Sequence, residues 1–270
     1  MLNKNELIID RVRSAVTHDL ADGHLLLRLT SIEEPSLATT AEGEEVVDAL
    51  GSTITTLYRA KKATFSGTNS LFAFDLAAAQ FGAKKVLGTS ENKITVPTYD
   101  ILTVANGTVK TTKTPADATK IKYIYALADG EIATTYKAGA SASTTEFVAA
   151  NDGTITVPTG VTGKIYVEYD YEAENAMKVT NKADEFPTSV GLTIHAYFRD
   201  KCNDNVVYSG KIIAPKAKLN PESVEIALTS TGKHGFEFVI QKDFCDEDAE
   251  LFSIIIADDA TNATPASVGA

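Results

Sequence analysis

The chain has 270 residues, a length that allows one large domain or two smaller ones, and we favour two. Its 36 acidic and 25 basic residues give a formal net charge of -11, which disfavours wrapping around nucleic acid because phosphates would be repelled. Met1–Asp10 lacks the basic and apolar regions of a signal peptide, and the apolar stretches are too short for a bilayer span. We therefore expect a soluble protein that is made in a reducing cytoplasm and has no membrane partner.

The first unusual segment is the long polar stretch Ser31–Ser52. The acidic residues that stand out in it are Glu33, Glu34, Glu42, Glu44 and Glu45. A loop of this length in a compact domain is uncommon, and it is usually functional or ordered only by a partner. We therefore predict a binding loop here, followed by a strand at Thr53–Phe65.

One helix is well marked, at Ser70–Gly82. Its predicted buried face consists of Leu71, Phe74, Ala78 and Phe81, which recur at helical spacing. Asn69 or Ser70 is expected to cap its start, and Gly82 lies where a left-handed stop is expected. A second, weaker helical segment is predicted at Asp246–Phe252.

The middle of the chain predicts short strands joined by tight turns. The turn-forming pairs are Asn106-Gly107, Asp129-Gly130 and Asp152-Gly153, which accept positive φ angles. This region is also rich in Thr, Ala and Ser and poor in Phe. Such regular spacing predicts a small β-sandwich that is inserted in, or appended to, the main fold.

Later segments alternate apolar and polar residues with a period of two, which places every second side chain on one face of a sheet. In Val190–Phe198 one face carries Val190, Leu192, Ile194, Ala196 and Phe198. The same pattern occurs in two further predicted strands, with apolar faces of Val224, Ile226 and Leu228, and of Phe236, Phe238 and Ile240. These segments predict antiparallel sheets with one solvated face.

The four histidines, His18, His24, His195 and His234, form no recognisable catalytic motif. His18 and His24 could bracket a metal ion with Asp19 and Asp22, but a solvated turn is the more ordinary interpretation. We predict neither an enzyme nor a cofactor or metal site.

Other motifs are equally weak. The acidic run Asp243–Glu250 lacks the ligand spacing of a calcium loop, and Ser230–Lys233 lacks the upstream Gly of a phosphate loop. Cys202 and Cys245 are interpreted as reduced thiols. The 10 Tyr and 11 Phe alternate with polar residues along strands, which favours core packing over a carbohydrate-binding platform.

The segment Lys211–Asp258 resembles the closing half of bacteriophage tail tube (major tail) proteins. The resemblance rests on Lys211–Leu219, Val224–Lys233 and Phe236–Ile240, together with the order of loop, strand and helix in the first 90 residues. It implies an all-β, tail-tube-like β-sandwich or barrel with one short α-helix, plus a second small β-sandwich. We expect residues 1–92 and 174–270 to form the tube fold, and residues 93–173 to form an inserted, immunoglobulin-like sandwich.

The resemblance also implies a function in the virion tail. Subunits of such proteins close into rings, usually of six, which stack into a tube that conducts DNA without binding it specifically. The implied partners are further copies of the chain and other tail proteins, and synthesis takes place in the cytoplasm of a host bacterium. Ser31–Ser52 would be the inter-ring loop. The ring-forming strands would present Ile54, Tyr58, Leu192, Ile194, Ile226, Leu228, Phe236 and Phe238.

Two other classes stay open at this point. A capsid decoration or baseplate protein would share the sandwich folds and the acidic, Thr-rich composition. A surface carbohydrate-binding or adhesion module is the third hypothesis. Fold resemblance alone does not decide among these classes.

Overall fold

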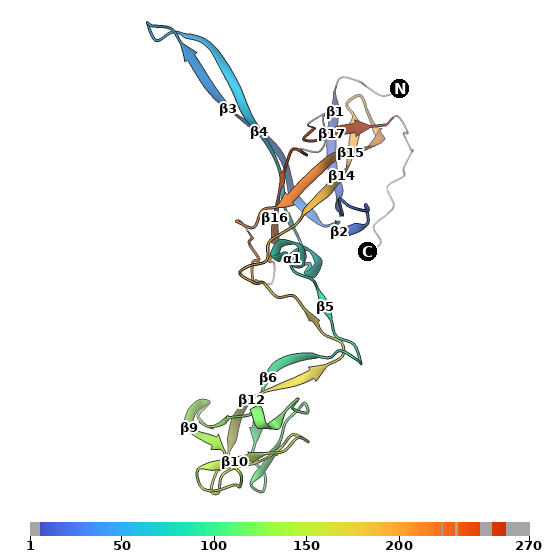
Figure 1. Ribbon diagram of the computed structural model, residues 1–270. Coiled ribbons are helices and arrows are strands. Elements are labelled where there is room, and N and C mark those ends of the chain that lie inside the picture. The colour runs from blue at the N-terminus through green and yellow to red at the C-terminus, as the bar shows by residue number, and fades with distance from the viewer. Residues whose placement is uncertain (1–5, 223, 230–231, 244–249, 258–270) are drawn as a thin grey trace. The chain divides into compact units, whose positions relative to one another are not determined.

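The computed structural model describes residues 6–222, 224–229, 232–243 and 250–257. The chain forms two compact units: unit 1 combines residues 1–85 and 179–270, and unit 2 comprises residues 86–178 (Figure 1). The all-β fold class is confirmed, with 57% of residues in strands, 5% in helices and a sheet that is nearly closed into a barrel. An immunoglobulin-like fold for the second unit stays a prediction.

Unit 1 is built on one antiparallel sheet with the strand order β2-β1-β14-β15-β16-β4-β3. An additional strand, β17, pairs with β15 beside β16. The strands of this sheet are β1 (Leu7–His18), β2 (Leu25–Leu29), β3 (Ile32–Val47), β4 (Thr53–Asn69), β14 (Ser189–Asp200), β15 (Asn203–Leu219), β16 (His234–Ile240) and β17 (Ser253–Ile256).

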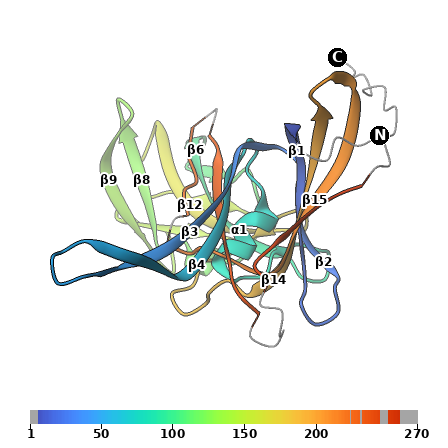
Figure 2. The same cartoon turned by 90° about the horizontal axis from the view of Figure 1, so that it is seen from above.

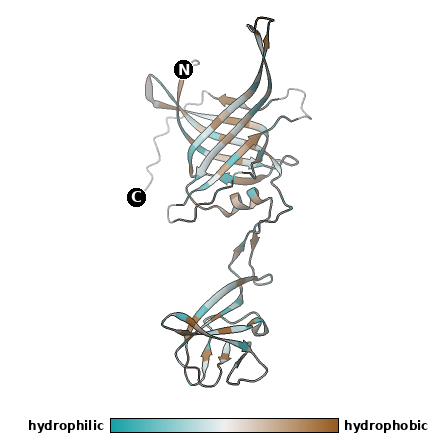
Figure 3. Cartoon of the chain, turned by 90° about the vertical axis from the view of Figure 1, so that its left-hand side faces the viewer, coloured by the Kyte–Doolittle hydropathy of each residue, from teal (hydrophilic) through white to brown (hydrophobic). Residues whose placement is uncertain are grey.

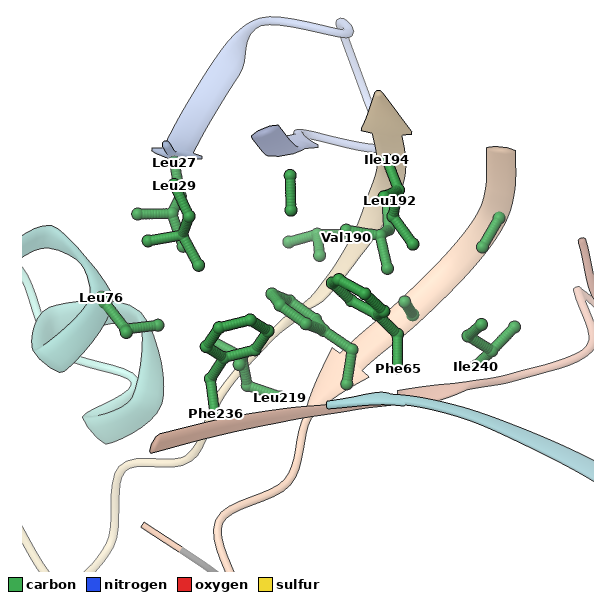
Figure 4. Close-up of a cluster of buried hydrophobic side chains, with 14 of the residues drawn as sticks. Leu27, Leu29, Phe65, Leu76, Val190, Leu192, Ile194, Leu219, Phe236 and Ile240 are labelled. Atoms are coloured by element: carbon green, nitrogen blue, oxygen red, sulfur yellow. The ribbon is translucent and has the colours of Figure 1, made fainter. Parts of the chain in front are cut away.

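Alternating side chains explain why these segments curl around a core. Along β14 and β16, buried and half-buried residues alternate without interruption, as the period-two pattern predicts. Phe65, Phe236 and Phe238 form an aromatic cluster with ring centroids 5.7 to 6.4 Å apart. Figure 4 shows this region, with leucines from β2 on the opposite side of the core. The hydropathy colouring of Figure 3 shows the same alternation along the curved sheet of unit 1.

The helix α1 (Phe74–Phe81) covers one end of this core with the fully buried Leu76. It begins four residues later than predicted. Its N-cap is Ala73, whose methyl side chain makes no capping bond. The predicted cap Asn69 is instead the last residue of β4, and its side-chain amide donates to the Leu71 carbonyl. The predicted face was wrong for Leu71, which is 65% exposed, and right for Ala78. Gly82 ends the helix in the left-handed conformation, as predicted.

Two predictions of local structure in unit 1 were wrong. Ser31–Ser52 is not a loop, because most of it forms the 16-residue strand β3. Val224–Leu228 forms no strand, because only Ile226 makes a single bridge, to His234, and Leu228 is 94% exposed. The predicted helix at Asp246–Phe252 lies mostly outside the described residues, as does most of the acidic run Asp243–Glu250.

Unit 2 has a core of its own, which includes the fully buried Ile124, Phe147, Ile155, Ile165 and Val167. Its seven-stranded sheet has the order β6-β12-β8-β9-β10-β11-β7. The members are β6 (Ile94–Thr103), β7 (Thr108–Lys110), β8 (Tyr123–Ala128), β9 (Glu131–Ala138), β10 (Glu146–Ala149), β11 (Thr154–Thr156) and β12 (Lys164–Ala173). A 3₁₀ helix, η1 (Ala118–Lys120), precedes β8. The chain enters and leaves the unit through a two-stranded sheet of β5 (Val86–Leu87) and β13 (Met177–Lys178).

The predicted turns occur where expected in unit 2. Asn106 and Gly107 both have positive φ angles, of 52° and 73°, and Asp129 and Gly130 have φ angles of 51° and 87°. The second pair joins β8 to β9 as a tight antiparallel hairpin. Asn, Asp and Gly tolerate these angles better than other residues, which explains why the turns were readable from the sequence.

Gly82 offers a direct test of how α1 is held on the barrel. Its φ is 66°, and a Cβ at this position would lie 2.3 Å from the Phe186 carbonyl oxygen. We expect Gly82→Ala to destabilise unit 1 by about 3 kcal/mol, because backbone strain and a steric clash add. The matched control is Gly51→Ala, since Gly51 also has a positive φ but faces open space, and it should cost about 1 kcal/mol. Hydrogen exchange of β16 peptides in increasing denaturant would measure both, and equal effects would contradict the close approach.

Candidate assembly surface

The most distinctive feature of unit 1 is a two-stranded arm, which we define as residues 40–62. Within it, β3 pairs only with β4, because β4 joins β16 only from Ala63 onward. Figures 1 and 2 show this ribbon extending away from the rest of the unit 1 sheet. The arm therefore has two solvated faces and two edges of its own, and it buries no core.

Local contacts hold the two strands of the arm together. Arg59 pairs with Glu44 at 3.2 Å and Lys62 pairs with Glu42 at 3.7 Å, but exposed ion pairs of this kind contribute little. The Tyr58 ring covers Gly43, where an added Cβ would meet it at 3.3 Å. At the tip, the Asp48 carboxylate accepts hydrogen bonds from the backbone N–H groups of Leu50 and Ser52, which fixes the turn.

The arm exposes apolar side chains that no part of unit 1 covers. They are Val46, Val47, Leu50, Ile54, Leu57 and Tyr58. Leu50 is 92% exposed at the turn, and Ile54 and Tyr58 are 66% and 74% exposed. A two-stranded hairpin is marginally stable in water by itself, and contiguous exposed apolar residues mark interaction sites. These properties indicate that the arm contacts another molecule.

The five predicted acidic residues all lie on β3, but in two groups. Glu42, Glu44 and Glu45 lie on the arm. Glu33 and Glu34 lie near the start of β3, at the end of the strand remote from the arm, where Glu33 pairs with Lys233 at 2.5 Å and accepts a hydrogen bond from Ser70 at 2.7 Å. The hydrogen bond with Lys233 is the largest cause that lowers the pKa of Glu33, and the hydrogen bond with Glu33 is the largest cause that raises the pKa of Lys233. Glu33 therefore ties β3 to the start of β16 within the chain.

The residues predicted to form the ring also separate into groups. Leu192, Ile194, Phe236 and Phe238 are buried in the core of unit 1. Ile54 and Tyr58 lie on the arm, and Leu228 is exposed in a segment without regular structure. Replacing Ile194 with Lys would therefore test folding and not assembly, because a charge would enter the core.

The sheet of unit 1 leaves free edges. The outer edge of β3 has no strand partner among the described residues, and neither does the outer edge of β1 from Leu7 to Ser14. A cavity of about 350 Å³ opens between these two strands, lined by Val12, Ile32, Leu37 and other apolar groups. The barrel is thus open on this side, with unpaired N–H and C=O groups along both borders.

The face of the unit 1 sheet that points away from the core carries a basic strip, which we define as Arg11, Arg13, Arg28 and Lys211 around His195. Burial is the largest cause that lowers the pKa of His195, followed by the charges of Lys211, Arg13 and Arg28. Arg11 and Arg13 lie over the Tyr197 ring at 5.6 and 5.9 Å. Within the described part of the chain, Arg13, Arg28 and Lys211 make no ion pair. Sequence reasoning missed the strip because its members come from three strands.

The four residues considered as possible metal ligands come together only in part. The side chains of Asp19, Asp22 and His24 lie close together on the exposed turn between β1 and β2, and His18 is not among them. The two aspartates already accept hydrogen bonds from backbone N–H groups of this turn, and His24 Nδ1 lies 2.5 Å from Asp22. These bonds account for the cluster as a solvated turn.

An extended hairpin, free sheet edges and a nearly closed barrel are the features of unit 1 that a structural, assembling protein would use. A comparison with protein families matches residues 7–247 to the YomU/Tube protein family, and the chain belongs to this family of phage tail tube-like proteins. The matched range includes both units. A search of curated proteins finds no match. In the described ranges, no helix has both the length and the apolar composition that a membrane crossing requires.

The start of β16 contains a buried histidine with a testable pH effect. His234 Nε2 lies 2.6 Å from Gln80 Oε1, and the His234 ring stacks on Phe72. Burial lowers the pKa of His234 below 6.5. The unfolded state then binds a proton more readily, so the free energy of unfolding should fall as the pH decreases below 6.5.

We therefore expect His234→Gln to flatten this pH dependence. His195, whose pKa is also lowered, supplies a remaining slope in the same direction. Urea unfolding midpoints between about pH 5 and pH 8 would measure the pH dependence of stability in the native chain and the variant. An unchanged slope in His234→Gln would contradict the buried neutral state.

Proposed function

We propose that this chain polymerises into rings that stack to form the DNA-conducting tail tube of a bacteriophage. The observation that carries the proposal is the arm, a ribbon of paired strands whose apolar residues have no partner within unit 1. Membership of a tube family supports self-assembly and contacts with other tail proteins. The virion tail is the location that follows from this function.

Ring closure satisfies the free sheet edges. The outer edges of β1 and β3 offer rows of backbone donors and acceptors on either side of the opening in the barrel. Pairing such edges between neighbouring copies, around a closed ring, removes every edge at once. Pro35 lies on β3 next to the opening, and it interrupts the row of donors there.

The arm then connects successive rings. Because its tip lies beyond the strands that build the barrel, it reaches past its own subunit and buries Leu50, Ile54 and Tyr58 against the next copy. Burying each large apolar side chain contributes about 1.5–3 kcal/mol before the cost of ordering is subtracted. A contact made by the tip of one copy on a different surface of the next is heterologous, and such contacts propagate into open stacks.

The basic strip faces protein in this arrangement. Arginine and lysine bind phosphates and would hold DNA in the channel, whereas the proposed tube lets DNA pass without specific binding. The strip therefore lies at a contact between subunits, where it meets acidic groups of a chain whose net charge is -11.

The arm is tested by one pair of variants. Leu50→Asp and Ile54→Lys should abolish tube formation, because charges enter the proposed interface, while the free subunit stays folded since both side chains are exposed. The matched control is Ile132→Lys, which changes an exposed isoleucine of unit 2. Negative-stain microscopy of concentrated protein should show hollow tubes with a regular repeat for the native chain and the control. Unchanged tubes from the arm variants would overturn the role of the arm, and a strictly monomeric native protein would overturn the tube.

The basic strip gives a separate prediction. Arg13→Glu combined with Arg28→Glu should shift the protein from rings to monomers, and high salt should weaken native rings because it screens charge. Lys137→Glu combined with Lys164→Glu, both at exposed positions of unit 2, is the control with the same change in net charge. Analytical ultracentrifugation measures the distribution of species, and equal ring formation by the strip variant and the control would place the strip outside the interface.

A further inference from the structure

Unit 2 exposes a row of tyrosines on one face of its sheet. Tyr166 on β12 lies opposite Tyr125 on β8, and Glu168 on β12 lies opposite Tyr99 on β6. The other face of β12 points into the core through Ile165 and Val167. The interpretation of the aromatic residues as core was therefore wrong here, since Tyr99 is 60% exposed.

Tyr99, Tyr125 and Glu168 border a cavity of about 510 Å³, which we call the tyrosine trough. Tyr99 lines it from β6, Tyr123 and Tyr125 line it from β8, and Glu168 and Asp170 line it from β12 between them. This volume falls within the range of small-ligand sites. The trough lies within unit 2 and shares no residue with the arm or the basic strip.

The tyrosines are held in place before any ligand arrives. The Tyr166 ring stacks on Tyr99 at 5.3 Å and packs against Tyr125 at 5.9 Å. The Tyr166 hydroxyl donates to Glu168 Oε1 at 2.6 Å, and this bond is the main cause that raises the pKa of Tyr166 to about 12. The row of rings is thus ordered at little further entropic cost.

Several polar groups of the trough have unused hydrogen-bonding capacity. In the described parts of the chain, the hydroxyls of Tyr99, Tyr123 and Tyr125 and the carboxylate of Asp170 make no hydrogen bond. Each phenol can both donate and accept, and a carboxylate accepts. A ligand that matches this set carries many hydroxyl groups next to an apolar surface.

We propose that the tyrosine trough binds a neutral saccharide. The C–H faces of pyranose rings pack on the tyrosine rings, and the sugar hydroxyls bond to the phenol and carboxylate oxygens. This binding activity goes beyond the assembly function and does not depend on it. Phosphorylated or carboxylated sugars are disfavoured, because Glu168 and Asp170 repel them.

The lysines that line the trough do not reverse this preference, because Lys120 and Lys122 are outnumbered by the carboxylates of Asp117, Glu168 and Asp170. The Lys122 ammonium donates a hydrogen bond to the Thr119 carbonyl at 2.8 Å, and the Asp117 carboxylate accepts hydrogen bonds from the N–H and the hydroxyl of Thr119. A second copy of the chain is a poorer occupant, because carboxylates between the tyrosines would be desolvated by an apolar protein surface.

The test uses the intact chain and defined probes. Immobilised neutral oligosaccharides of hexoses and N-acetylhexosamines are compared with sialylated and phosphorylated ones, and a choline-coated surface serves as the cation probe. Binding to at least one neutral set is expected. Tyr99→Ala and Tyr123→Ala should each weaken it about tenfold or more. The control Ile132→Ala should leave it unchanged, because Ile132 does not line the trough.

Glu168→Gln provides a second variant that keeps the shape of the site while it removes the charge. It should retain neutral saccharide binding within about tenfold and permit some binding of the anionic sugars. Absence of neutral saccharide binding, binding confined to choline or anionic sugars, or full binding by Tyr99→Ala would each overturn the proposal. Tube formation by the tyrosine variants, scored by microscopy, should be normal, and its loss would identify the trough as an assembly contact instead.

Discussion

A sheet that does not close on itself leaves rows of backbone N–H and C=O groups without partners, and this constraint governs the architecture of unit 1. The strand β15 pairs with β14 on one side and with β17 and then β16 on the other, so most of the sheet is satisfied internally. Among the described residues, the features left unpaired include the opening between β1 and β3 and the arm. These features would suit a subunit of the proposed tube.

The sequence was most informative where the chemistry of a single residue decides the backbone. Gly82 and the pair Asp129-Gly130 were read correctly, because left-handed conformations select for Gly, Asn and Asp. Strands with strict alternation, such as β14 and β16, were also predicted correctly, because burial on one face imposes the period. In these elements the local sequence pattern and the tertiary structure favour the same backbone conformation.

The errors have a different physical origin. β3 looked like a loop because both faces of the arm are solvated, so its sequence has no period-two pattern, and only pairing with β4 makes it a strand. Val224–Leu228 shows the reverse case, since its alternation matches a strand while it meets the start of β16 only at the single Ile226–His234 bridge. Alternation also does not reveal which face is buried: Leu192 points into the core, whereas Tyr99 points into solvent.

The acidic net charge of the chain and its locally basic strip would have compatible roles in the proposed tube. In the proposed tube, a net charge of -11 would oppose the approach of separate subunits and would disfavour adhesion of passing DNA. Such repulsion would also oppose assembly, unless the subunits meet where the sign changes. Arg13, Arg28 and Lys211 supply that local reversal on a rigid sheet, where the order of strands fixes the spacing of the charges. In the proposed tube, the strip would set the register between copies while the apolar arm would supply binding free energy, because charge complementarity selects partners more than it strengthens binding.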